Sequence, residues 1–351
     1  MSKFDYMRFN KIDAVGTPDC KFPPHPRNKD GNWRRVGFEL EFAGLDPQRV
    51  VGILTDLFGG RIEEENIFLF KVKDTELGDF RIEIDAALLK EKRYVDFLSQ
   101  VGVDVDKWDK RQSLDEFVLK FAREFVPCEI VAPPVSLRDI PKIDGLRRKL
   151  YEARAKGTQE SIFYAFGLHI NVEPADFSRK SILAVLRAFI LVEPAIRSMS
   201  KTDMIRVLTP YIDQYPAQYM RMVLDSEYNP PLMSDLIRDY MTYNPSRNRS
   251  LDMMPLFAYL EPEVYTEFDL KNKLVKPRPA YHYRLPNSSV GDPFWSIVSD
   301  WNLWVRVEEL AADPDLLAGF SRDFIRLGGF PHNIFNTWRK QVREWLDPDR
   351  A

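Results

Sequence analysis

The chain of 351 residues is poor in cysteine, has no long apolar run and shows no marked excess of either charge. Its two cysteines, Cys20 and Cys128, are too few for a disulfide framework and lack the paired spacing of a metal site, which is typical of a reducing compartment. No apolar run approaches the roughly 18 residues that span a bilayer, and the first residues lack the apolar segment of a secretion signal. We therefore expect a cytoplasmic protein with no membrane partner.

The charge balance and the glycine pattern exclude further classes. The 50 basic and 53 acidic residues are scattered and leave a net charge of −3, so there is no electrostatic reason to expect nucleic acid as a partner. No glycine-rich phosphate loop is visible, and no serine or cysteine lies in a nucleophile elbow. Hydrophobic residues make up 44% of the chain, which is ample for a large core. The sequence predicts a globular, enzyme-sized protein without a nucleophilic side chain.

The chain does contain short apolar segments in which two polar residues are separated by one apolar residue. These pairs are Glu39 and Glu41, Glu83 and Asp85, His169 and Asn171, and His282 and Arg284. Successive side chains of a strand point to opposite faces, so each pair lies on one face and the apolar residues lie on the other. Carboxylate, imidazole and carboxamide groups that recur on one face indicate a site for a hard cation and an anionic ligand.

The rest of the chain divides into an irregular arm at 1–33, a domain at 34–291 with a helical middle segment, and C-terminal helices at 292–351. The expected helices lie near 46–58, 113–125, 178–199, 215–226 and 231–242, and the expected strands near 35–42, 66–73, 79–85, 126–131, 166–172 and 280–285. Because helices of irregular length separate strands with one polar face, an α+β fold with a mostly antiparallel sheet fits better than a regular doubly wound α/β sheet. We expect the Trp-rich C-terminal helices to pack aromatic residues into the core.

Three carboxylates on apolar strands, those of Glu39, Glu41 and Glu129, form a pattern that suits Mg²⁺, which takes oxygen ligands together with water and nucleotide phosphates. Any one of these glutamates alone is as readily a surface side chain. His169 alone is equally a hydrogen-bonded core histidine or a ligand. Asn171, two residues on and on the same face, favours the functional interpretation.

Five segments in this order resemble the motifs of the amidoligases, which belong to the carboxylate-amine ligase superfamily of glutamine synthetase and gamma-glutamylcysteine ligase. The segments are 36–42, 85–88, 129–134, 167–172 and 281–286. The resemblance spans about 35–290 and implies a curved antiparallel sheet of the glutamine synthetase type. It also implies ATP-dependent amide formation through an acyl phosphate, with Mg²⁺ on the concave face. The implied substrates are a carboxylate and an amine, as small molecules or peptides, with a glutamine amidotransferase as a candidate partner that supplies ammonia.

The resemblance also implies roles for single residues. Glu41 and Glu129 match ligands of the metal nearer the carboxylate substrate, and Glu39, His169 and His282 match ligands of the metal that bridges the ATP phosphates. Arg284 matches the arginine that meets the transferred phosphoryl group, Asp85 matches an acidic position near a metal or the amine, and Arg247 or Arg249 matches a second phosphate contact. Asn171 is expected beside the nucleotide.

One departure from the family pattern bears on the metal. His282 stands where the family usually has a glutamate, and imidazole favours Mn²⁺ or Zn²⁺ over Mg²⁺. Two alternatives therefore stay open. Beside the ligase, the chain could be a metal hydrolase or non-haem iron oxygenase that uses His169, His282 and a carboxylate, or a non-catalytic descendant that binds nucleotide or peptide.

Overall fold

The computed structural model describes residues 18–66, 68–84, 127–158, 166–199, 212–268, 275–327 and 332–346. In these ranges nine strands form one sheet in the order β2-β3-β4-β5-β1-β7-β9-β8, and β6 pairs with the start of β1. The strands are β1 (Arg35–Phe42), β2 (Arg61–Asn66), β3 (Leu69–Thr75), β4 (Gly78–Ile84), β5 (Cys128–Val131), β6 (Val135–Ser136), β7 (Leu168–Val172), β8 (Leu251–Asp252) and β9 (Tyr281–Tyr283). All these pairings are antiparallel, so the predicted α+β class with a mostly antiparallel sheet is confirmed.

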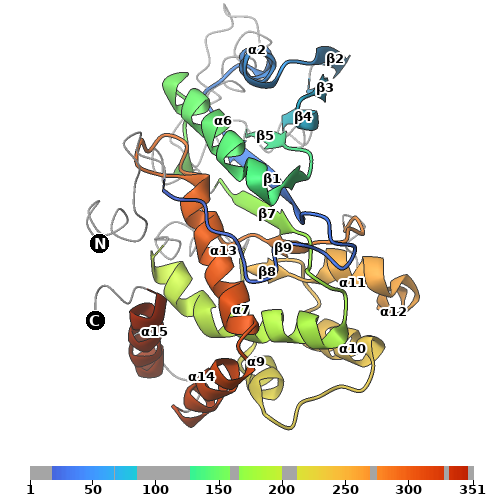
Figure 1. Cartoon of the computed structure of the whole chain (residues 1–351), viewed down its shortest axis with the longest axis vertical. Helices are drawn as coiled ribbons and strands as arrows, with labels where there is room; N and C mark the ends of the chain where they lie inside the picture. The colour runs from blue at the N-terminus through green and yellow to red at the C-terminus, as the bar shows by residue number, and fades with distance from the viewer. Residues whose placement is uncertain are drawn as a thin grey trace, which may run out of the picture.

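Helices cover one face of this sheet (Figure 1). The helices within the described residues are α2 (Pro47–Phe58), the 3₁₀ turn η2 (Leu137–Asp139), α6 (Ile140–Glu152), α7 (Arg179–Met199), α9 (Ala217–Leu224), α10 (Met233–Tyr243), α11 (Met254–Leu260), α12 (Pro262–Thr266), α13 (Ile297–Ala311), α14 (Pro314–Arg326) and α15 (His332–Leu346), of which α6 and α13 lie against this face. The long helix α7 packs against α13, α14 and α15, and α13 also packs against α6. Among the described residues, no helix combines the length and the apolar character needed to cross a membrane.

Local sequence explains where α2 begins and ends. The side chain of Asp46 accepts a hydrogen bond from the backbone N–H of Gln48 and caps the helix. Gly59 follows the last turn with a φ of 68° and a ψ of −155°, a conformation outside the left-handed helical region that glycine adopts readily. Gly60 has a φ of 96°, and a Cβ there would lie 2.5 Å from the carbonyl oxygen of Lys73. The glycine pair therefore ends the helix and brings the chain close to β3.

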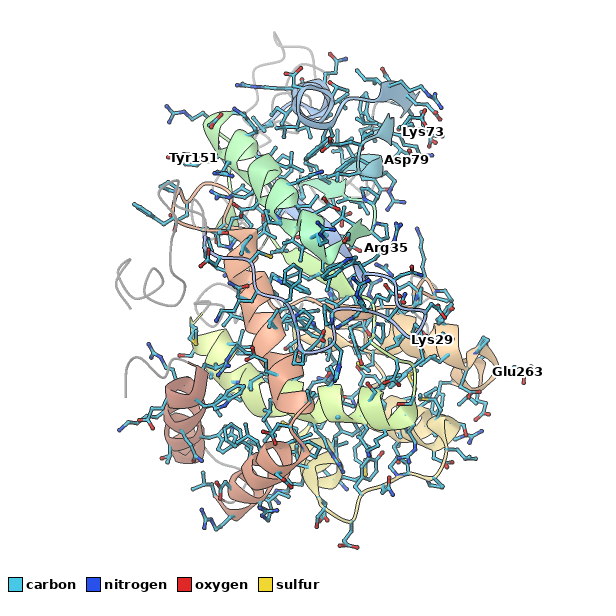
Figure 2. All side chains as sticks on the ribbon, viewed as in Figure 1. Lys29, Arg35, Lys73, Asp79, Tyr151 and Glu263 are labelled. Carbon is cyan, nitrogen blue, oxygen red and sulfur yellow. The ribbon has the colours of Figure 1, made fainter. Side chains whose placement is uncertain are left out.

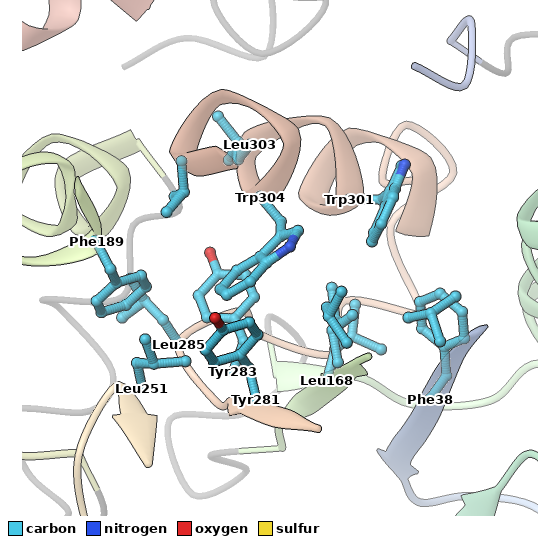
Figure 3. Close-up of a cluster of buried hydrophobic side chains, with 14 of the residues drawn as sticks. Phe38, Leu168, Phe189, Leu251, Tyr281, Tyr283, Leu285, Trp301, Leu303 and Trp304 are labelled. Carbon is cyan, nitrogen blue, oxygen red and sulfur yellow. The ribbon is translucent and has the colours of Figure 1, made fainter. Parts of the chain in front are cut away.

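The apolar residues of the strands face the helices. On β1 the buried residues Phe38 and Leu40 alternate with the polar positions. Figure 3 shows Trp301 and Trp304 of α13 above the strands. The Trp304 ring lies 5.5 Å from that of Tyr281 on β9, centroid to centroid. The predicted aromatic packing of the C-terminal helices is thus confirmed, and it fixes α13 on the apolar face.

The opposite face carries the charged side chains. Figure 2 shows Arg35, Lys73 and Asp79 on the side of the sheet away from α6, whose Tyr151 lies on the other side. At the β2 end this face carries exposed ion pairs, such as the pair of Arg61 and Asp74. Exposed pairs of this kind contribute little to stability.

Most of the expected elements match the structure. The predicted strand at 35–42 has those bounds, and the predicted helix at 178–199 is α7. β2 was not expected, because Arg61–Asn66 is almost entirely polar and exposed. The helix expected at 113–125 lies outside the described residues, and the division into an arm, a domain and C-terminal helices stays a prediction.

Candidate active site

The strand register brings the polar pairs of the sequence onto one face. On β1, Glu39 is paired with His169 of β7, and Glu41 is paired with Glu129 of β5. Asn171 of β7 is paired with His282 of β9. Paired residues of antiparallel strands project on the same side of the sheet, so these side chains form one cluster.

Glu39 lies at the centre of this cluster and accepts three side-chain hydrogen bonds. Its Oε2 accepts from Nδ1 of His169 at 3.0 Å, and its Oε1 accepts from Nδ2 of Asn171 at 2.9 Å and from Nη1 of Arg278 at 2.7 Å. Burial by itself would raise the pKa of Glu39. The hydrogen bond from His169, with smaller electrostatic contributions from His282, His169 and Arg278, outweighs burial and holds this pKa well below its usual value. Glu39 is therefore ionised and is the acceptor in each contact.

The amide of Asn171 fixes the tautomer of His282. Its Oδ1 accepts from Nη1 of Arg278 at 2.9 Å and lies 2.8 Å from Nδ1 of His282. A carbonyl oxygen can only accept, so Nδ1 of His282 carries the proton and Nε2 keeps its lone pair. Burial lowers the pKa of His282 well below its usual value, which keeps the ring neutral. Nδ1 of His169 likewise carries a proton, because it donates to the ionised Glu39.

Glu41 and Glu129 form the second part of the cluster. Oε2 of Glu41 accepts a hydrogen bond from the backbone N–H of Gly167 at 2.7 Å. Burial, together with the negative charges of Glu39, Glu41 and Glu83, raises the pKa of Glu129 to about 8. Within the described ranges, the structure shows no cation paired with Glu41 or Glu129. Two carboxylates held together in this way favour a bound cation.

Two overlapping groups have ligand atoms close enough to share a metal ion. One contains Glu39, His169 and His282, and the other contains Glu41, Glu129 and His169; in each group the ligand atoms lie within 4.8 Å of one another. His169 belongs to both groups. The structure thus brings together all five residues that the sequence analysis assigned to a metal, whereas their role as ligands stays a prediction.

Arg284 lies beside this cluster. Its Nη1 donates to the backbone carbonyl of Arg247 at 2.7 Å, and its side chain is almost fully buried. Burial lowers the pKa of Arg284, opposed chiefly by the negative charge of Asp252. Burial also raises the pKa of Asp252 to about 6, opposed by a hydrogen bond from the backbone N–H of Met254 and by the charge of Arg284. Arg284 therefore presents a guanidinium next to the carboxylates of the sheet.

Two residues of the expected site are not placed in the cluster. Nη1 of Arg249 donates to the backbone carbonyl of Gln214 at 2.5 Å, and no described contact joins it to the carboxylates of the sheet. Asp85 lies outside the described residues.

Sequence reasoning missed Arg278, which contacts both Glu39 and Asn171. It lies between two prolines just before β9, and the stretch 275–280 has no strand period that could have marked it. The available signal was its position: an arginine a few residues before a strand that carries site residues.

On this antiparallel sheet, carboxylate, imidazole and guanidinium groups converge on one face, where they offer candidate ligands for a cation and donors for an anion. Residues 32–306 match the model of the family described as "Putative amidoligase enzyme". The chain belongs to this amidoligase family and is an enzyme of the ligase class. No match was found among curated proteins or among solved structures.

Proposed function

We propose that the protein is an ATP- and divalent-metal-dependent ligase that joins a carboxylate to an amine. One observation carries the proposal: Glu41, Glu129 and His169 place three ligand atoms within 4.8 Å of one another on the polar face of the sheet. Family membership supports a ligase, and the buried Arg284 beside the carboxylates supports phosphoryl transfer rather than hydrolysis of a neutral bond.

The proposed reaction has two steps. An oxygen of the substrate carboxylate attacks the γ-phosphorus of ATP, and the bond to ADP breaks, which yields an acyl phosphate and ADP. The amine nitrogen then attacks the acyl carbon, inorganic phosphate leaves, and the nitrogen loses a proton to give the amide. When bound, a divalent ion neutralises phosphate charge and orients the phosphates. Arg284 would stabilise the transferred phosphoryl group, and Asp85, Arg247 or Arg249 would contact the amine or the phosphates.

The donor set fits a divalent metal ion. Glu41 and Glu129 supply hard oxygen ligands, as Mg²⁺ prefers, and His169 supplies an imidazole that also suits Mn²⁺. We extend the proposal to a fold of the glutamine synthetase type, on the strength of the antiparallel sheet with helices on one face. The proposed substrates are small molecules or peptides, with ammonia from a glutamine amidotransferase as one source of the amine.

One observation favours a second function, a non-haem iron oxygenase or metal hydrolase. Glu39, His169 and His282 are two imidazoles and one carboxylate with ligand atoms within 4.8 Å, as in a facial triad. The hydrogen bonds that hold Glu39, and the family match, argue for the ligase. Anaerobic titration with Fe²⁺, followed by optical spectra before and after oxygen is admitted, separates the two functions.

The test of the ligase is release of ADP from ATP in the presence of Mg²⁺ or Mn²⁺ and arrays of paired carboxylates and amines. We expect turnover with at least one pair and none in Glu41→Gln, because this variant removes a metal ligand. Glu64→Gln is the matched control, since Glu64 lies exposed on β2 away from the cluster. Equal turnover in both variants would remove Glu41 from the site.

A further inference from the structure

We propose that the guanidinium of Arg278 takes the place of a divalent ion beside Glu39. The active site then holds one divalent ion, bound through Glu41, Glu129 and His169. This inference rests on the proposed function, because it asks how many ions the ligase site uses.

The contacts of Glu39 are the first argument. An ionised carboxylate offers about four acceptor positions. Three of them are taken by His169 at 3.0 Å, by Asn171 at 2.9 Å and by Arg278 at 2.7 Å. One position remains, but a metal ion bound there would lie beside the guanidinium that already supplies a charge-assisted hydrogen bond to this carboxylate. Glu39 is therefore occupied by side chains of its own chain.

Charge is the second argument. The side chain of Glu39 is only 13% exposed, so its surroundings screen charge poorly. One negative charge of Glu39 is balanced by one positive charge of Arg278, and a divalent ion added there would leave two positive charges without counter-charge. At the other group, a divalent ion would displace the proton that Glu129 holds, and Glu41 and Glu129 would then carry two negative charges, which match one divalent ion. The neighbouring Glu83 is already paired with Arg81 at 2.9 Å.

The third argument is which ring nitrogen of His169 carries the proton. Nδ1 of His169 donates to Glu39, so the nitrogen left to bind a metal is Nε2. A carboxylate that holds the other nitrogen of a metal-bound imidazole orients that ring and strengthens it as a ligand. Glu39 is thus a positioning residue for His169. Asn171 holds His282 in the same way, through Nδ1.

The experiment counts Mn²⁺ bound to the full chain by equilibrium dialysis and electron paramagnetic resonance, without nucleotide, at pH 7.5. We expect one ion in the wild type. Arg278→Met should bind two, because it frees Glu39, which together with His282 can hold a second ion while His169 stays with the first. Arg278→Lys should bind one, because the charge remains. Arg35→Met is the matched control, since it removes a positive charge from the same face of the sheet where the guanidinium donates to the carbonyl of Pro134, and it should bind one.

Two further variants identify the ligands. Glu129→Gln should weaken the single ion by at least about tenfold, whereas Glu39→Gln should keep a stoichiometry of one with a smaller loss. Two ions in the wild type, or one ion in Arg278→Met, would overturn the role of Arg278 and leave the metal-dependent ligase standing. No ion in any variant at millimolar Mn²⁺ would instead overturn the metal site of the proposed function.

Discussion

At the scale of single residues, the buried carboxyl group of Glu129 lowers the stability of the metal-free protein at high pH. Burial and the neighbouring Glu39, Glu41 and Glu83 raise its pKa to about 8, from an ordinary value of 4.5. The folded protein therefore binds a proton that the unfolded chain has already released between these two pH values. Stability of the metal-free protein should fall as the pH rises through this window and level off above pH 8.

We expect Glu129→Gln to remove this pH dependence, because the amide keeps the shape of the side chain and carries no charge. At pH 9 the metal-free variant should be more stable than the wild type, on the order of 2 kcal/mol. At pH 4 the two should agree, since Glu129 is then protonated in both states. Urea unfolding of both proteins in a chelator, at pH 4, 6 and 9, measures the difference. Parallel pH profiles would contradict the account.

Arg284 gives a second prediction at this scale. Lysine would keep the positive charge but lose the planar set of donors that holds two oxygens at once. Under the proposed function, Arg284→Lys should therefore lose nearly as much ATP turnover as Arg284→Ala, about 2–4 kcal/mol of transition-state stabilisation. Steady-state ADP release measures this loss, and circular dichroism checks the fold. Turnover at the wild-type rate in the lysine variant would remove Arg284 from the chemistry.

At the scale of elements, a buried ion pair ties α13 to the start of β1. Nη1 and Nη2 of Arg34 donate to the two carboxylate oxygens of Glu308 at 2.6 and 2.7 Å. The guanidinium also donates to the backbone carbonyls of His25 and Glu173, and its side chain is fully buried. The pair thus joins the arm before β1, the strand β7 and the helix that covers the apolar face.

Breaking this pair should be costly. Glu308→Gln leaves the buried charge of Arg34 without its partner, so we expect a loss of about 3–5 kcal/mol in the free energy of unfolding. The control is Arg61→Met, which breaks the exposed pair with Asp74 and should cost far less. Urea unfolding monitored by tryptophan fluorescence compares the two. Equal losses would show that the buried pair is no stronger than a surface one.

The elements that sequence predicted well are those whose pattern comes from burial. In β1, Val36, Phe38 and Leu40 are buried while Glu39 is partly exposed, and this alternation is visible in the sequence. β2 is exposed along most of its length, so its sequence shows no alternation of apolar and polar residues. It pairs with β3. An edge strand of this kind is defined by its neighbour rather than by its own residues.

The same reasoning applies to the site. Glu39, Glu41, His169 and His282 could be found because their strands alternate, and Glu129 because it precedes a double proline and fits the family motif. Arg278 could not be found in this way, because it lies in a segment whose apolar and polar residues do not alternate as in a strand. Its contact with Glu39 joins residues 239 positions apart, which only the folded sheet defines.

At the scale of the whole molecule, ligand binding should stabilise the fold. A divalent ion that binds only the folded protein adds about 2.7 kcal/mol at one hundred times its Kd. We expect Mn²⁺ to raise the Tm of the wild type by several degrees and to raise the Tm of Glu129→Gln by clearly less. The control Glu64→Gln should respond like the wild type. Differential scanning calorimetry with and without the ion tests this, and a rise in Glu129→Gln equal to that of the wild type would place the ion elsewhere.

The order of strands in the sheet has a consequence for synthesis of the protein. β1 lies between β5 and β7, and β7 pairs with β9, which is near the C-terminal third of the chain. A nascent chain that has left the ribosome only as far as β7 already carries Glu39 and His169, but it lacks Arg278, His282 and Arg284. Under the proposed function, such a chain cannot yet consume ATP. Under that function, the newly made protein becomes active only when β9, which carries His282, has been translated and has paired with β7.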